Sequence, residues 1–222
     1  MGSWIKLKPE SGVTIAAWRA DPAGTPRGGI VVIQEIFGVN SHIRSICEGY
    51  AADGFSVIAP ALFDRYEKGV ELGYTPPDIE HGRALKGKAG IDAALMDVAS
   101  AREALKGSGK IGVVGYCWGG YVTWISASRL SGIACAVPYY GGGMLEAVEE
   151  KPRCGVMAHF GELDTGIPVA GVRKFAAAHP EVQVFIYPAN HGFGCDQRGA
   201  YDPPSAKLAR ERSLAFFREH IG

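Results

Sequence analysis

Short runs of β-branched and other apolar residues recur along this chain, and segments with helical spacing lie between them. Strands that alternate with helices are typical of βαβ units, whose strands run parallel. Several runs are apolar at every position, as required of strands that helices cover on both faces. We therefore expect an α/β fold with a mostly parallel central sheet and helices on both faces. The expected strands are residues 29–34, 56–59, 111–114, 135–139, 155–160 and 182–187.

The segments outside these strands predict helices, a sheet edge and one insertion. The expected helices, from apolar spacing and stop signals, are residues 91–105, 119–128 and 205–219. Residues 4–7 and 14–19 are expected to pair antiparallel at a sheet edge. Residues 63–90 contain several prolines and glycines and should form the least regular stretch, of a kind that often borders a site. A length of 222 residues fits one domain, residues 1–222.

The charge balance argues against two classes of partner. The chain has 23 basic and 23 acidic residues, so no overall field draws it to nucleic acid or to an anionic membrane. The apolar runs are shorter than the roughly 18 residues of a membrane helix, and the first residues lack the pattern of a secretory leader. Lys6 stands where a myristoylation motif has serine or threonine. We expect a cytoplasmic protein, a monomer or weak homodimer, that acts on a small molecule.

The cysteines and histidines form no metal-binding motif in the sequence. Five scattered cysteines without a C-x-x-C spacing fit free thiols in a reducing compartment, so no metal is expected. Cys47, Cys135 and Cys154 are interpreted as small buried apolar residues. The histidines without a matching context are interpreted as surface or packing residues; they are His42, His81, His159, His179 and His220.

The motif G-Y-C-W-G-G at residues 115–120 carries the strongest chemical signal. It lies between an expected strand and an expected helix, which is the context of a nucleophile elbow. Glycines on both sides of Cys117 keep the crowded, strained turn free of clashes. A thiol at a helix amino terminus is favoured as the thiolate, the form that attacks a carbonyl. The alternative is a chance match in a glycine-rich chain.

Two more side chains follow later strands in the chain order of α/β-hydrolase triads, namely nucleophile, acid and histidine. Asp164 follows the expected strand 155–160, and His191 follows the expected strand 182–187. Carboxyl ends of parallel strands are where ligands bind in open α/β sheets. His191 would take the proton from Cys117 or from water, and Asp164 would orient the ring. Glu162 is the alternative acid, interpreted as a turn residue.

A carboxylate also follows the first expected parallel strand, in the motif Q-E-I-F-G at residues 34–38. One interpretation is that Glu35 faces Cys117 across the site. The backbone amides of Ile36 and Trp118 would then form the oxyanion hole, because hydrolases of this fold take one donor from each of these two loops. The alternative is a solvated loop glutamate.

With these motifs, the sequence resembles the dienelactone hydrolase family, the carboxymethylenebutenolidases, nearly from end to end. The segments P-A-L-F at residues 60–63 and A-R-E-R at residues 209–212 are also similar to the family. The resemblance implies an α/β-hydrolase domain and a cysteine hydrolase without a cofactor. It implies opening of the dienelactone ring to maleylacetate during degradation of chlorinated aromatics. It also implies that Glu35 keeps Cys117 quiet until the substrate carboxylate disturbs that pairing.

The chain departs from the family at the residues that bind the substrate carboxylate. The family uses two arginines, one in the irregular segment and one four residues after the histidine, where this chain has Cys195. Arg83 could be the first arginine, whereas Arg198 is displaced from the position of the second. An arginine fork meets a carboxylate bidentately, so its loss weakens binding of anionic substrates.

Two further hypotheses therefore remain beside the lactone hydrolase. The same scaffold could act on another carbonyl, such as an aryl ester, a thioester or a longer lactone. In the other, the protein binds a ligand or senses oxidants through Cys117 without catalysis.

Overall fold

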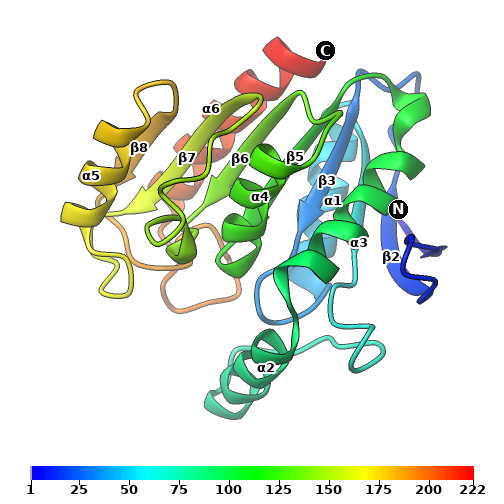
Figure 1. Cartoon of the computed structure of the whole chain (residues 1–222), viewed down its shortest axis with the longest axis horizontal. Coiled ribbons are helices and arrows are strands. Elements are labelled where there is room, and N and C mark those ends of the chain that lie inside the picture. The colour runs from blue at the N-terminus through cyan, green and yellow to red at the C-terminus, as the bar shows by residue number, and fades with distance from the viewer. Residues whose placement is uncertain (1) are drawn as a thin grey trace.

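The computed structural model describes residues 2–222 and contains an eight-stranded sheet in the order β1-β2-β4-β3-β5-β6-β7-β8 (Figure 1). The strands are β1 (Ser3–Leu7), β2 (Ile15–Ala20), β3 (Gly29–Ile33), β4 (Ser56–Pro60), β5 (Ile111–Tyr116), β6 (Cys135–Tyr139), β7 (Gly155–Gly161) and β8 (Gln183–Tyr187). From β4 to β8 all neighbours pair in parallel, whereas β1 and β2 pair antiparallel at one edge. The expected mostly parallel sheet and its antiparallel edge are confirmed.

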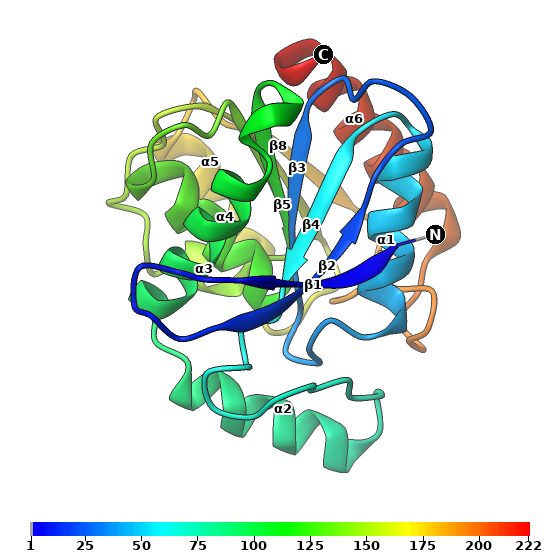
Figure 2. The same cartoon turned by 90° about the vertical axis from the view of Figure 1, so that its right-hand side faces the viewer.

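Helices cover both faces of the sheet, as expected. They are α1 (Ser41–Ala52), α2 (Pro76–Lys88), α3 (Ile91–Ala104), α4 (Trp118–Arg129), α5 (Val169–Ala178) and α6 (Pro203–Ile221). α1 and α6 lie on one face, and α3, α4 and α5 lie on the other (Figure 2). α1, α2 and α5 had no counterpart among the predicted helices. Among the helices of residues 2–222, none is long and apolar enough to cross a membrane.

The apolar pattern of β3 shows why the sheet lies between two helical layers. All five of its residues are buried. Ile30 and Val32 pack in one apolar cluster, whereas Val31 and Ile33 pack in a second one, because successive side chains of a strand point to opposite faces. Each fully buried residue of this kind contributes roughly 1.5–3 kcal/mol to folding. The strand is therefore stable only with helices on both sides.

The insertion predicted to be irregular contains the thirteen-residue helix α2, so that expectation was wrong for residues 76–88. Thr75 and Asp78 form a reciprocal capping box, in which each side chain bonds the backbone of the other. Only Gly82 and Leu85 of α2 are buried, so the helix has no apolar stripe from which to predict it. A Cβ at Gly82 would lie 2.2 Å from the Ile36 carbonyl oxygen. Glycine therefore lets α2 approach the loop after β3.

Candidate active site

Cys117 occupies a sharp turn between the end of β5 and the first residue of α4. Its backbone has φ 56° and ψ −117°, a conformation that non-glycine residues rarely adopt. A Cβ at Gly115 would lie 2.1 Å from the Gly119 carbonyl oxygen, and a Cβ at Gly119 would lie 2.4 Å from that of Gln34. The glycines of the motif are thus required by close backbone contacts, as the elbow interpretation predicts.

His191 and Asp164 lie on the loops after β8 and β7 and form a hydrogen bond of 2.7 Å between Nδ1 and Oδ2. The other carboxylate oxygen, Oδ1, accepts bonds from the amides of Gly166 and Ile167 at 2.9 and 3.2 Å. These two amides fix the carboxylate, which is 3% exposed, so that Oδ2 points at the imidazole. Of the two carboxylates that the sequence offered as the acid, Asp164 contacts His191, whereas Glu162 is exposed.

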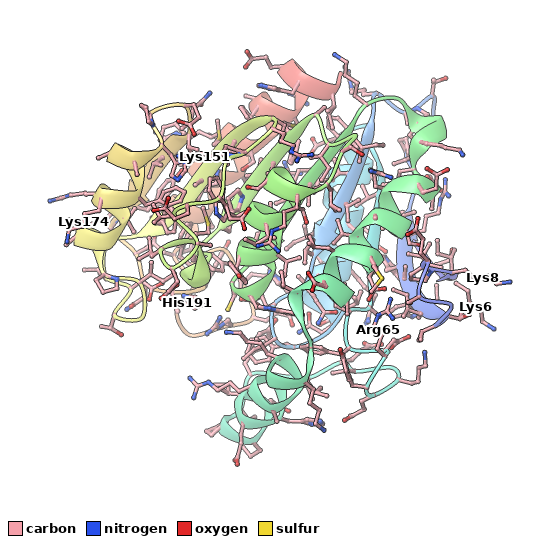
Figure 3. The ribbon with its side chains drawn as sticks, viewed as in Figure 1. Lys6, Lys8, Arg65, Lys151, Lys174 and His191 are labelled. Atoms are coloured by element: carbon pink, nitrogen blue, oxygen red, sulfur yellow. The ribbon has the colours of Figure 1, made fainter. Side chains whose placement is uncertain are left out.

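The thiol and the imidazole line the same cavity, which has a volume of about 690 Å³. Asp164 and Trp118 also border it. His191 lies at the lower edge of the sheet in Figure 3, the side on which Figure 1 shows α2. Burial of the ring opposes its protonation, but the bond with Asp164 and the neighbouring Cys117 side chain outweigh this and raise the pKa of His191 to about 10. The pair thus favours a protonated imidazole beside the sulfur.

Glu35 is 1% exposed, so the alternative of a solvated loop glutamate is wrong. Its Oε1 accepts a hydrogen bond of 3.1 Å from Nη1 of Arg198, although the sequence places this arginine away from the family position. The guanidinium also lies 5.6 Å from the ring centroid of Phe37 and 5.9 Å from that of Tyr74. Burial of the Arg198 guanidinium lowers its pKa, but the charges of Glu35 and Cys117 more than offset this effect. The pKa of Arg198 is therefore raised.

The other predicted arginine, Arg83, is on α2 and borders the cavity of Cys117 and His191. Lys86, three residues further along the same helix, borders it too and was not predicted. Both side chains are exposed. Their spacing places them on one face of the helix, so α2 supplies two positive charges at the cavity.

Two backbone amides were predicted to form an oxyanion hole. Trp118 is the first residue of α4, and amides in a first helical turn have no intrahelical acceptor. The Ile36 amide, on the loop after β3, donates to no other group in residues 2–222. The contact between Gly119 and the Gln34 carbonyl packs these two loops together. Both donors are therefore available, and their joint role stays a prediction.

One aromatic residue at the site had no signal in the sequence. Tyr140 follows β6 with φ 37°, and its ring centroid lies 5.1 Å from that of His191. Its hydroxyl is buried without a hydrogen-bond partner in residues 2–222. Burial raises the pKa of Tyr140 far above its ordinary value, and the charges of Glu35 and Cys195 act in the same direction. The phenol of Tyr140 therefore stays neutral beside the imidazole.

The strand order and the three loop residues define an α/β hydrolase, and comparison with known proteins specifies the family. The dienelactone hydrolase family profile matches residues 15–221, and the chain belongs to this family. A Synechocystis sp. protein named "Putative carboxymethylenebutenolidase" is 35% identical over 234 residues, covering 96% of this chain and 95% of its own. An Azospirillum brasilense protein of the same name is 34% identical over 225 residues, covering 94% of this chain and 95% of its own.

A solved structure agrees with this family. The "Crystal Structure of Putative Dienelactone Hydrolase" from Klebsiella pneumoniae superposes with a TM-score of 0.85 at 26% identity, covering 99% of this chain and 100% of that one. The family and these relatives support a hydrolase of the esterase type. The predicted resemblance to the dienelactone hydrolases is therefore confirmed.

Proposed function

We propose that this protein hydrolyses a lactone or small ester through a cysteinyl acyl intermediate, with Cys117 as nucleophile, His191 as base and Asp164 as orienting acid. The single observation that carries the proposal is the Nδ1–Oδ2 bond of 2.7 Å between His191 and Asp164 on a cavity that Cys117 also lines. A histidine whose Nδ1–H donates a hydrogen bond to a carboxylate presents Nε2 to the nucleophile.

The reaction follows from these positions. His191 Nε2 holds the proton of the Cys117 thiol, as the raised pKa of His191 favours, and the thiolate sulfur bonds to the carbonyl carbon. The carbonyl oxygen becomes negative and receives hydrogen bonds from the amides of Ile36 and Trp118. The carbon–oxygen bond of the ester then breaks, and the leaving oxygen takes the proton from His191. Water, deprotonated by His191, attacks the thioester carbon, and the carbon–sulfur bond breaks to release the acid. The proton that His191 took from water then neutralises the sulfur, which restores the starting Cys117–His191 pair.

The charges around the cavity support an anionic lactone as substrate, with carboxymethylenebutenolide to maleylacetate as the proposed conversion. Arg83 and Lys86 border the cavity from α2 and offer cations to a substrate carboxylate. The ion pair of Glu35 with Arg198 supports a role for Glu35 in controlling the thiol, because a second carboxylate would compete for this guanidinium. The proposed setting is the breakdown of aromatic compounds.

A second candidate substrate is a neutral ester or thioester. The specific observation that favours it is that Arg198 already pairs with Glu35, which leaves fewer free cations for a substrate carboxylate. Comparing kcat/KM for anionic lactones and for neutral esters of equal size separates the two candidates. Strong preference for the anionic lactone would reject the neutral substrate.

The nucleophile is tested by Cys117→Ala, with Cys154→Ala as the matched control at a half-buried thiol outside the cavity. We expect Cys117→Ala to abolish turnover of dienelactone and of an activated ester while the fold persists. Cys117→Ser should be strongly impaired, because a hydroxyl needs more help from the base. Retained activity in Cys117→Ala would reject the proposed nucleophile.

A further inference from the structure

Behind the proposed catalytic residues, three side chains from different elements meet in the interior. Glu35 lies on the loop after β3, His42 in the first turn of α1, and Cys195 on the loop after β8. One possible ligand atom of each, a carboxylate oxygen, a ring nitrogen and the sulfur, lies within 4.8 Å of the others. All three residues are at most 3% exposed. The proposed chemistry uses Glu35 but neither His42 nor Cys195, and it does not account for the meeting of the three side chains.

Two polar atoms of these side chains have no hydrogen-bond partner in residues 2–222. They are Oε2 of Glu35 and Nε2 of His42. Buried polar groups are almost always paired, because burial removes their hydrogen bonds to water and an unpaired group gains none in return. Two unpaired acceptors beside one another, next to a thiol, are therefore unusual. They indicate a positively charged ligand between them.

The hydrogen bond between His42 and Asp196 fixes the orientation of the imidazole ring. Its Nδ1 donates a hydrogen bond of 2.9 Å to Oδ1 of Asp196. A neutral ring that donates from Nδ1 keeps a free electron pair on Nε2, which is the unpaired buried atom. The same carboxylate–histidine arrangement orients histidine ligands in metal sites.

The other two side chains are also fixed by outer contacts. Arg198 binds Oε1 of Glu35, so that Oε2 stays free for another partner. The Cys195 sulfur lies 3.2 Å from the hydroxyl of Tyr74, which accepts a hydrogen bond from Asn40 Nδ2 at 3.1 Å. With its oxygen accepting from Asn40, this hydroxyl can turn its own proton toward a thiolate. Each potential ligand thus has one supporting contact.

We propose that Glu35, His42 and Cys195 form a binding site for a divalent zinc ion. Nitrogen, oxygen and sulfur donors together suit Zn²⁺, whereas Mg²⁺ and Ca²⁺ take oxygen donors. Binding replaces the thiol proton of Cys195, which passes to solvent, so one carboxylate and one thiolate balance the ion. Bonds of about 2.0–2.3 Å in a tetrahedron give ligand separations of about 3.3–3.8 Å, so the widest pair closes by at most about 1.5 Å.

His42 connects this cluster to a second cavity, which Glu35 and Cys195 do not line. His42 and Asp196 both line an open cavity of about 300 Å³ between α1 and α6. The Asp196 side chain is 59% exposed and supplies a negative charge to this cavity, which Lys207 and Arg210 also line. None of the three side chains lines the cavity of Cys117, so zinc binding can be measured without any turnover of an ester.

The test measures zinc affinity by competition with a chromophoric chelator in the Cys117→Ala protein, which removes the reactive thiol as a ligand. The expected result is one equivalent of bound Zn²⁺ that Mg²⁺ does not displace. Cys195→Ser and His42→Gln should weaken binding by at least about 100-fold, and Asp196→Asn by about 10- to 100-fold. Cys154→Ser and His81→Gln, a half-buried thiol and an exposed histidine outside the cluster, should bind like the parent.

Cobalt gives an independent measurement. Co²⁺ bound by Cys195 should produce a sulfur-to-metal charge-transfer absorption that Cys195→Ser lacks. The exposed change Asp196→Asn keeps the test valid if a buried variant fails to fold. A parent that binds no zinc at one equivalent, or variants of Cys195, His42 and Asp196 that bind as tightly as the controls, would overturn the proposal.

Discussion

Arg198 and Glu35 are 163 residues apart in sequence, yet Nη1 of the arginine donates a 3.1 Å hydrogen bond to Oε1 of the glutamate. The glutamate is 1% exposed, and in residues 2–222 only Arg198 forms an ion pair with its carboxylate. The loop after β8 is thereby connected to the loop after β3, at the edge of the sheet where the proposed catalytic residues lie.

Removing the cation of this pair should destabilise the fold strongly. Arg198→Ala leaves a buried carboxylate unpaired and should lower the free energy of unfolding by about 3–5 kcal/mol, measured by urea denaturation. Lys207→Ala, in the exposed pair with Glu211, should change it little. Adding Glu35→Gln to Arg198→Ala should restore part of the loss. Equal stability of Arg198→Ala and Lys207→Ala would show that the buried pair contributes nothing.

The cations of α2 should determine how anionic substrates bind. Arg83→Ala should lower kcat/KM for an anionic lactone roughly tenfold, mainly through KM, because a charge-assisted hydrogen bond is lost. The value for a neutral ester of equal size should stay the same. Arg173→Ala, an exposed arginine on α5, is the matched control in steady-state kinetics. Equal losses on both substrates would contradict a carboxylate-binding role.

The raised pKa of His191 makes stability depend on pH. The folded protein keeps the imidazole protonated up to about pH 10, whereas the unfolded chain releases the proton near 6.5. Stability from this group is therefore complete below pH 6.5 and is lost as the pH rises toward 10. In urea denaturation between these pH values, Asp164→Asn should show a shallower fall than the natural protein, because the carboxylate charge is absent. Parallel curves would be inconsistent with this pairing.

The turn that presents Cys117 should not tolerate a side chain at Gly119. A Cβ there would lie 2.4 Å from the Gln34 carbonyl oxygen, so Gly119→Ala must shift the elbow. A shift of about 1 Å at a reacting group can cost 100-fold in rate, and we expect kcat/KM to fall at least that far. Gly87→Ala is the control, since its Cβ would meet no atom within 4 Å in helix α2. Similar activity of the two variants would argue against a strained elbow.

The parallel strands could be predicted from the sequence because burial on both faces leaves runs without polar residues, as in β3 and β5. The loop positions of Cys117, Asp164 and His191 followed, since carboxyl ends of parallel strands meet at one edge. Helix α2 could not be predicted from periodicity, because it buries only two residues and depends on its cap.

Contacts that depend on loop conformation could not be predicted from the sequence. The ion pair of Arg198 with Glu35 and the packing of Tyr140 on His191 join segments whose mutual approach no local pattern records. The cluster of Glu35, His42 and Cys195 also joins distant segments and could not be predicted. From the sequence, His42 was interpreted as a surface or packing residue. That Nε2 of His42 is buried without a partner can be recognised only in the folded structure.

The central claim is tested most directly by trapping the acyl intermediate. The protein is mixed with an activated acetyl ester, quenched in acid within the first turnover, digested and analysed by peptide mass spectrometry. We predict an acetyl group on Cys117, bound as a thioester that hydroxylamine removes at neutral pH. A rapid release of leaving group with the acetyl on another residue, or with Cys117 unmodified, would contradict the account.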